Sequence, residues 1–215
     1  MNTNTTYLFI DASAVKPWVG ILKSGQWLAL HVLREQALES IFTGTNQCLN
    51  ETGLSLKNIQ GFIHCEGPGS VLGVRLSAMA INCWRAMPAW QNAEIKTYQS
   101  LHLIRVIILD QTKSKKSFHI ISEARKNMWN CLSNQEPKIQ FIEQNTLHQL
   151  EGTLHHYQQR KSWHQAPQSA HPFVLDLSNC AKYLYRQDIV THKENPTIFE
   201  AHADTYKKWD HTRHR

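Results

Sequence analysis

The first ninety residues contain short, unbroken apolar runs of the length that strands have. Residues 7–11 and 59–65 are two such runs, rich in isoleucine and aromatic side chains, and each predicts a β-strand. Residues 18–22 and 27–32 are two more, and they flank a turn that contains Gly25. Two strands joined by a short, glycine-containing turn predict a β-hairpin.

Between the hairpin and the next strand, apolar positions recur every three or four residues, which is the spacing of an amphipathic helix. Gly53 follows this segment and suits the left-handed position at which many helices end. The residues that carry the spacing are Leu38, Ile41, Phe42, Thr45, Cys48, Leu49 and Thr52.

A glycine-rich turn leads directly into a second predicted helix, which Pro88 ends. Ser70 suits the N-cap, because its side-chain oxygen can accept from a free amide of the first turn. No Gly-Lys-Ser/Thr follows the glycines, which excludes a Walker-type loop. A tight turn before a core helix is favoured over a phosphate cradle, because glycine-rich turns are common. The helix is apolar nearly all round and must be covered on more than one side. The motif residues are Gly67, Pro68, Gly69, Ser70, Gly73 and Arg75.

The pattern restarts after the second helix but becomes less regular, and from Pro137 the chain is rich in glutamine and histidine. Asn127 tolerates the left-handed region and predicts a turn between two strands. The elements expected here are a helix at 97–105, strands at 105–110, 117–122 and 128–133, an apolar run at 172–177 and a helix at 179–186.

Strands followed by helical crossovers indicate mixed sheets with helices packed against them. We therefore expect an α/β fold of two lobes. Residues 1–100 would form the N-terminal lobe, with the hairpin and both early helices, and residues 101–215 a smaller C-terminal lobe. A chain of 215 residues is long enough to bury a sizeable core.

Composition narrows the class of protein further. The five cysteines are odd in number and widely spread, which favours a reducing cytoplasm with free, mostly buried thiols. No apolar run approaches the ~20 residues that cross a bilayer, and the polar N-terminus does not resemble a signal peptide, so we expect no membrane association. The net charge of +6 is scattered, which is typical of a solvated surface rather than of a nucleic-acid-binding patch.

Several motifs together resemble the TsaB (YeaZ) family. Residues 8–13, the hairpin, and Gly67-Pro68-Gly69-Ser70 followed by Gly73-Val74-Arg75 occur in the family's order. Residues 123–127 are similar to the family's Asp-Ala-Arg-x-Gly turn, and the segment around 196–209 is similar to its closing segment. The chain departs from the family where Gln36 stands in place of a histidine, where Val71-Leu72 replace Phe-Thr, where Glu123 replaces an aspartate, and over residues 137–169.

The resemblance implies a two-lobed fold of the actin-like, sugar-kinase-like (ASKHA) kind that has lost its own chemistry. TsaB is the non-catalytic partner that activates TsaD, a transferase that threonylcarbamoylates the adenosine beside the tRNA anticodon. The implied partners are thus a TsaD-like catalytic subunit and a TsaE-like ATPase, with tRNA engaged indirectly through the complex. A second copy of the chain is the alternative partner when the TsaD-like subunit is absent, and the expected location is the cytoplasm.

The end of the first strand agrees with a lost active site. Residues 11–17 contain no glycine where a phosphate would press against the backbone, and Pro17 lacks an amide donor. We assign Asp11 and Ser13 to a vestigial phosphate loop and expect no catalytic residue, no cofactor and no metal. Asp11 is interpreted as a structural carboxylate at a strand end.

Nine of the thirteen histidines lie from His148 onward. The metal-bearing relative needs a His-x-x-x-His pair on one helix face, and no such pair occurs in this chain. His155 and His156 are a poor chelating pair, because neighbouring side chains on a strand or helix point apart. These histidines, with His164 and His171, are interpreted as part of a solvated polar segment.

The two early helices carry more apolar surface than one sheet can hide. We expect a partner, or a second copy of the chain, to pack on both of them and to bury ~800 Å² per side. Small side chains would let the partner's backbone approach closely. The residues assigned to this interface are Leu38, Ile41, Phe42, Thr45, Leu49, Val74, Ser77, Ala78, Ala80 and Ile81.

Two other functions stay open. The chain could be a small-molecule kinase or a metal-dependent transferase of the same fold, which predicts affinity for nucleotide. It could instead bind RNA through a basic tail, which predicts tRNA binding by the chain alone with a steep salt dependence. The basic residues of that tail are Lys207, Lys208, Arg213 and Arg215.

Overall fold

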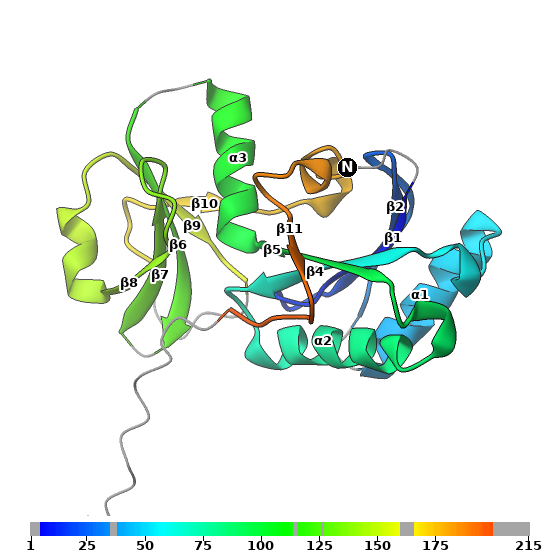
Figure 1. Ribbon diagram of the computed structural model, residues 1–215. Helices are drawn as coiled ribbons and strands as arrows, with labels where there is room; N and C mark the ends of the chain where they lie inside the picture. The colour runs from blue at the N-terminus through cyan, green and yellow to red at the C-terminus, as the bar shows by residue number, and fades with distance from the viewer. Residues whose placement is uncertain (1–4, 35–37, 114–115, 126, 160–165, 200–215) are drawn as a thin grey trace, which may run out of the picture.

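The computed structural model describes residues 5–34, 38–113, 116–125, 127–159 and 166–199, which form two mixed β-sheets flanked by helices (Figure 1). The α/β class with mixed sheets is therefore confirmed. The first sheet has six strands in the order β11-β5-β4-β1-β2-β3, and the second has five in the order β10-β9-β6-β7-β8. Gln36 and the four basic residues of the tail lie outside the described residues.

The first sheet contains every strand predicted in the first ninety residues. Its central strands β1, β4 and β5 run parallel, while β2, β3 and β11 pair antiparallel at the two sides. Gly25 has a φ of 73° in the hairpin turn, as its place in the sequence predicts. The strands are β1 (Thr6–Asp11), β2 (Trp18–Lys23), β3 (Gln26–Val32), β4 (Gly61–Gly67), β5 (Glu94–Gln99) and β11 (Thr191–Lys193).

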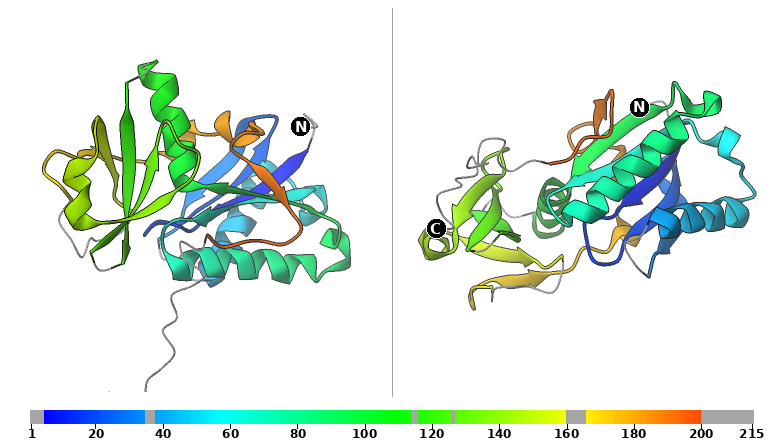
Figure 2. Two further views of the ribbon diagram at one scale, coloured as in Figure 1. Left: turned by 60° about the vertical axis from the view of Figure 1, so that its left-hand side comes forward. Right: turned by 90° about the horizontal axis from the view of Figure 1, so that it is seen from below.

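Helices α1 (Leu38–Thr52) and α2 (Val71–Arg85) cover one face of the first sheet, so both early helix predictions are confirmed (Figure 2). The two helices touch through Phe42 and Trp84, whose rings meet edge to face at 5.1 Å. Single 3₁₀ turns at Leu56–Asn58 and Pro88–Trp90 connect them to the strands that follow. None of the helices in the described part of the chain has the length and apolar character needed to cross a bilayer.

Helix α3 (Ser100–Thr112) stands between the two sheets (Figure 1). Leu103, Val106 and Ile107 pack on the first sheet, while Leu101, Ile104 and Ile108 pack on the second. The strand predicted at 105–110 is therefore wrong, because a helix buried on two sides loses its polar face and reads as a continuous apolar run. The predicted helix at 97–105 begins at Ser100, after residues that belong to β5.

The second sheet confirms the strands predicted at 117–122 and 128–133. Asn127 has a φ of 62° at the turn between them. A 3₁₀ segment, Gln144–Gln149, covers the outer face of this sheet through Leu147. The strands are β6 (Phe118–Arg125), β7 (Met128–Ser133), β8 (Gln140–Glu143), β9 (Thr153–Tyr157) and β10 (His171–Phe173).

After β10 the chain returns to the first sheet. The helix predicted at 179–186 is wrong: the structure has two 3₁₀ turns, Leu177–Asn179 and Tyr183–Tyr185. Asp176 accepts from the backbone and hydroxyl of Ser178, and such local hydrogen bonds compete with a regular helix. This segment packs on the face that α3 covers, and β11 then extends the sheet. The C-terminal half thus completes the core of the N-terminal lobe.

Candidate partner-binding face and strand-end cluster

The Gly67–Ser70 turn is built to approach the loop after β1. Ser70 caps α2 by accepting from the Gly73 amide at 3.2 Å, as predicted, and its own amide donates to the Ser13 carbonyl at 2.7 Å. A Cβ on Gly69 would lie 2.2 Å from the Ser13 oxygen. Glycine is therefore required at position 69 by contact with the chain's own backbone, which favours the structural interpretation of the turn.

The same turn is tied to the second sheet. The Pro68 carbonyl accepts from Ser100 at 3.0 Å and also from the side-chain amide of Gln159, which follows β9. The Gln159 carbonyl in turn accepts from the Val15 amide at 2.9 Å. Gln159 thus links the turn, the loop after β1 and the second sheet at one point.

The C-terminal segment covers the carboxyl ends of β4 and β5. Thr197 and Gln99 donate to the Glu66 carboxylate at 2.7 and 2.8 Å, and the Phe199 amide donates to the Glu66 carbonyl. Burial alone would raise the pKa of Glu66, but these hydrogen bonds and the charge of Lys193 outweigh it and leave the pKa below its usual value. The edge of the sheet at which α/β proteins commonly bind ligands is here covered by the chain itself.

Asp11, the centre of the predicted vestigial loop, is 3% exposed. One carboxylate oxygen accepts from the Ser13 amide at 2.8 Å, and the other accepts from the Tyr98 hydroxyl at 2.5 Å. Ser13 is fully buried beside it. Both carboxylate oxygens are engaged within the chain, which agrees with a structural role for Asp11.

The groups that surround Asp11 stay protonated at neutral pH. Burial, and then the Asp11 charge, raise the pKa values of Cys65, Tyr98 and Tyr157 well above their usual ranges. A buried, protonated thiol is neither a nucleophile nor a metal ligand. Among the described residues, no group of three or more histidine, cysteine, aspartate or glutamate side chains could hold a metal ion.

Most of the residues assigned from the sequence to the partner interface lie inside the first lobe. Ala80, Ile81 and Ser77 of α2 are fully buried, and Leu38 and Phe42 of α1 are partly buried against the same core. The buried members face the chain's own core and present little surface to a partner, whereas Leu38 and Phe42 keep part of their surface exposed. The other buried members are Ile41, Thr45, Leu49, Val74 and Ala78.

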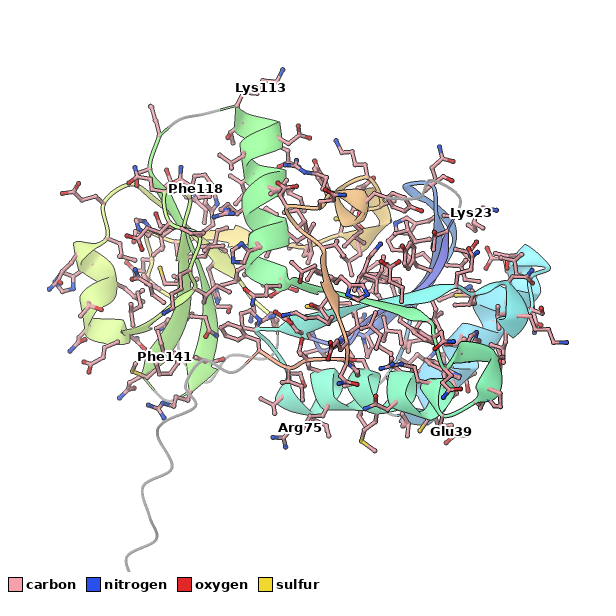
Figure 3. The ribbon with its side chains drawn as sticks, in the orientation of Figure 1. Lys23, Glu39, Arg75, Lys113, Phe118 and Phe141 are labelled. Atoms are coloured by element: carbon pink, nitrogen blue, oxygen red, sulfur yellow. The ribbon has the colours of Figure 1, made fainter. Side chains whose placement is uncertain are left out.

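The opposite side of α2 carries an exposed apolar stripe, and none of its residues is among the ten assigned from the sequence to the interface. Leu72 and Met79 are 61% and 51% exposed, Cys83 is also exposed, and Met87 continues the line just past the helix end. Leu72, Met79 and Cys83 are spaced by seven and four residues and so share one helix face. The signal was present in the sequence as a second apolar face. Arg75, also exposed, points outward from the same side of the helix (Figure 3).

The outer side of α1 is polar, with exposed Glu39, Thr43, Asn46, Gln47 and Asn50. A hollow of about 460 Å³ lies between the end of β3 and this side of the helix, and Arg34 lines it together with Glu39. An apolar stripe beside a polar, hollowed surface matches the apolar centre and polar rim of protein interfaces.

Solved structures similar to this chain include YeaZ from Pseudomonas aeruginosa, with a TM-score of 0.48 and 19% identity over 64% of each chain. A protein with similarity to peptidase YEAZ from the same organism has a TM-score of 0.49 and 20% identity, over 64% of this chain and 63% of that one. A Ppx/GppA phosphatase from Aquifex aeolicus has a TM-score of 0.34 and 10% identity, over 64% and 51%. No protein-family model and no curated protein matches the sequence. In each of these three structures, the matched part is less than two thirds of the neighbour's own length.

Proposed function

We propose that the chain is a non-catalytic subunit of the TsaB kind, which binds and activates a TsaD-like transferase in threonylcarbamoylation of tRNA. A TsaE-like ATPase would join the same cytoplasmic assembly, and tRNA would be engaged by the complex rather than by this chain alone. In the absence of the transferase, two copies of the chain would pair through the same face.

The closed cluster of Asp11, Ser13, Glu66 and Gly69 at the ends of β1 and β4 supports a non-catalytic role. Each carboxylate oxygen of Asp11 accepts a hydrogen bond from within the chain, the Ser13 carbonyl fills the space beside Gly69, and Thr197 donates to the Glu66 carboxylate near the end of β4. A nucleotide phosphate needs free amides and space at such a place. Here the chain's own groups take up both.

The exposed stripe of α2 is the observation that carries the proposal. Leu72, Met79 and Cys83 lie on the outer side of a helix that lies next to α1 on one face of the sheet. A partner that presents two similar helices would bury this stripe at the centre and leave Arg75 and Glu39 at the rim. Binding would then depend on the outward residues of α2 and not on Ala78 or Ala80, which are buried within the chain.

The test is the affinity of the purified chain for the TsaD-like subunit of the same cell, measured by titration calorimetry. We expect the double variant Leu72→Glu, Met79→Glu to bind more than about a hundredfold more weakly, because two charges would be buried in an apolar contact. Val174→Glu is the matched control, since Val174 is 86% exposed and lies outside α1 and α2.

Thermal unfolding of the three proteins should be alike, because all the substituted side chains are exposed. Undiminished affinity in the double variant would contradict the proposed face. Micromolar binding of ATP to the isolated chain would contradict the non-catalytic role and favour a kinase or transferase of the same fold.

A further inference from the structure

The second sheet brings two histidines together that lie sixteen positions apart in the sequence. His155 of β9 and His171 of β10 are direct partners in the parallel pairing of these strands. Their rings are 6.1 Å apart between centroids, with 45° between the ring planes. His156 turns to the other face, where its ring meets Trp129. The adjacent histidines therefore point apart, as predicted, while a histidine from the next strand takes the place beside His155.

The spacing of the two rings suits a shared metal ion. A zinc ion about 2 Å from a ring nitrogen lies about 3 Å from the centroid of that ring, so one ion can contact two rings whose centroids are about 5–6 Å apart. The observed 6.1 Å needs little side-chain rotation to reach this arrangement. Register partners on neighbouring strands project to the same side of a sheet, so both rings approach from one side.

Of the two histidines, His155 is held in place by a neighbouring ring, while His171 is open to solvent. The His155 ring packs edge to face on Phe118 at 5.7 Å, which limits its rotation. His171 is exposed at the start of the edge strand β10, which is three residues long. An ion could therefore enter from solvent and keep water in its remaining coordination positions.

We propose that His155 and His171 form a two-imidazole site for a borderline divalent transition-metal ion such as Zn²⁺. Imidazole nitrogen is a ligand that Zn²⁺, Ni²⁺ and Cu²⁺ share, whereas Ca²⁺ and Mg²⁺ prefer oxygen. With two protein ligands, the site binds more weakly than a four-ligand structural zinc site. A bound ion would cross-link β10 to β9 and fasten the short edge strand to the sheet.

The experiment titrates the full chain with Zn²⁺ alone at neutral pH and follows heat release. Because the chain has thirteen histidines, the measured quantity is the difference between variants. His171→Ala should weaken the tightest binding event by more than about tenfold, since one of two ligands is lost. His148→Ala, another exposed histidine of the second half, is the matched control and should bind like the unsubstituted chain.

A second measurement tests the shared site in the unsubstituted chain and does not depend on how His171→Ala affects the sheet. Substoichiometric Ni²⁺ should broaden the ring proton signals of both His155 and His171 in the unsubstituted chain before those of other histidines. Hydrogen exchange of the His171 and Phe173 amides should also slow when Zn²⁺ is added. Unchanged Zn²⁺ binding in His171→Ala, or broadening of one ring without the other, would refute the shared site.

Discussion

Because Gly69 has no side chain, the turn before α2 can pack directly against the loop after β1. Its backbone lies so near the Ser13 carbonyl that even a methyl group would overlap it, and the side chain of Gln159 lies on the same side. In most phosphate-binding turns a glycine makes room for the ligand. Here the glycine makes room for the chain's own loop after β1.

Replacing this glycine should therefore cost stability. Gly69→Ala forces the Ser13 backbone to move and strains the bond between the Ser70 amide and Ser13, so we expect a loss of about 2–3 kcal/mol in the free energy of unfolding. Gly53→Ala is the control: no atom lies within 4 Å of its added Cβ, but its φ of +65° should cost about 1 kcal/mol. Urea denaturation measures both, and equal losses would show that the contact with Ser13 is unimportant.

His64 is an uncommon residue for the centre of a sheet. It is fully buried in β4, and neither ring nitrogen has a well-oriented hydrogen-bond partner among the described residues. Burial lowers its pKa to about 4, although the Glu66 charge acts in the opposite direction. His64 is therefore neutral in the folded chain at pH 7.

This buried imidazole predicts acid sensitivity. The unfolded chain binds a proton at His64 near pH 6.5 and the folded chain does so only near pH 4, so stability falls as the pH drops between these values. The full loss is about 3 kcal/mol. His64→Leu should remove this part of the pH dependence, while His148→Leu, an exposed control, should retain it. Denaturation midpoints from pH 7 to pH 4 measure the effect, and an unchanged slope in His64→Leu would contradict it.

Helix α2 shows what a periodic pattern can and cannot assign. The helix, its Ser70 cap and its end before Pro88 follow from local rules and are confirmed. The side facing the sheet could not be read from an apolar sequence, because Ala80 and Met79 are adjacent apolar positions and only packing decides which is buried. The residues assigned to the interface from the sequence are therefore mostly buried ones. The exposed apolar stripe on the other side of α2 is seen only in the structure.

Elements in the second half were harder to predict for a related reason. Residues 105–110 belong to a helix with two buried sides, so their apolar run fits a strand equally well. His155 and His171 meet through strand register, which no local spacing encodes. By contrast, Asp11 sits at a strand end and the turn at 67–70 precedes a helix, and both follow from residue type and order alone.

Helix α3 joins the two sheets into one packed structure. It supplies Leu103 and Val106 to the first sheet and Ile104 and Ile108 to the second. The segment that contains Leu184 and Ile189 adds to the core on the same face of the first sheet. The two lobes are therefore joined by a helix that belongs to both hydrophobic cores, rather than by a linker.

Because α3 and the C-terminal segment complete the core of the first sheet, we predict that the N-terminal lobe does not fold by itself. A fragment of residues 1–100 would expose the face of the first sheet that α3 and residues 177–190 cover, and we expect it to show no cooperative unfolding transition. Circular dichroism during urea denaturation measures this. A fragment of residues 1–199 retains all of that cover and should show a cooperative transition. A cooperative transition in the 1–100 fragment would support two independent lobes.

Because α3 packs on both sheets, it also sets the orientation of the second sheet relative to the first. A partner seated on α2 would hold the first sheet, and through α3 it would fix the direction in which the second sheet faces. The distant strands would then be positioned for a further component of the assembly without being touched by the first. If the proposed partner binds α2, loosening α3 would leave that binding intact and change the orientation of the second sheet.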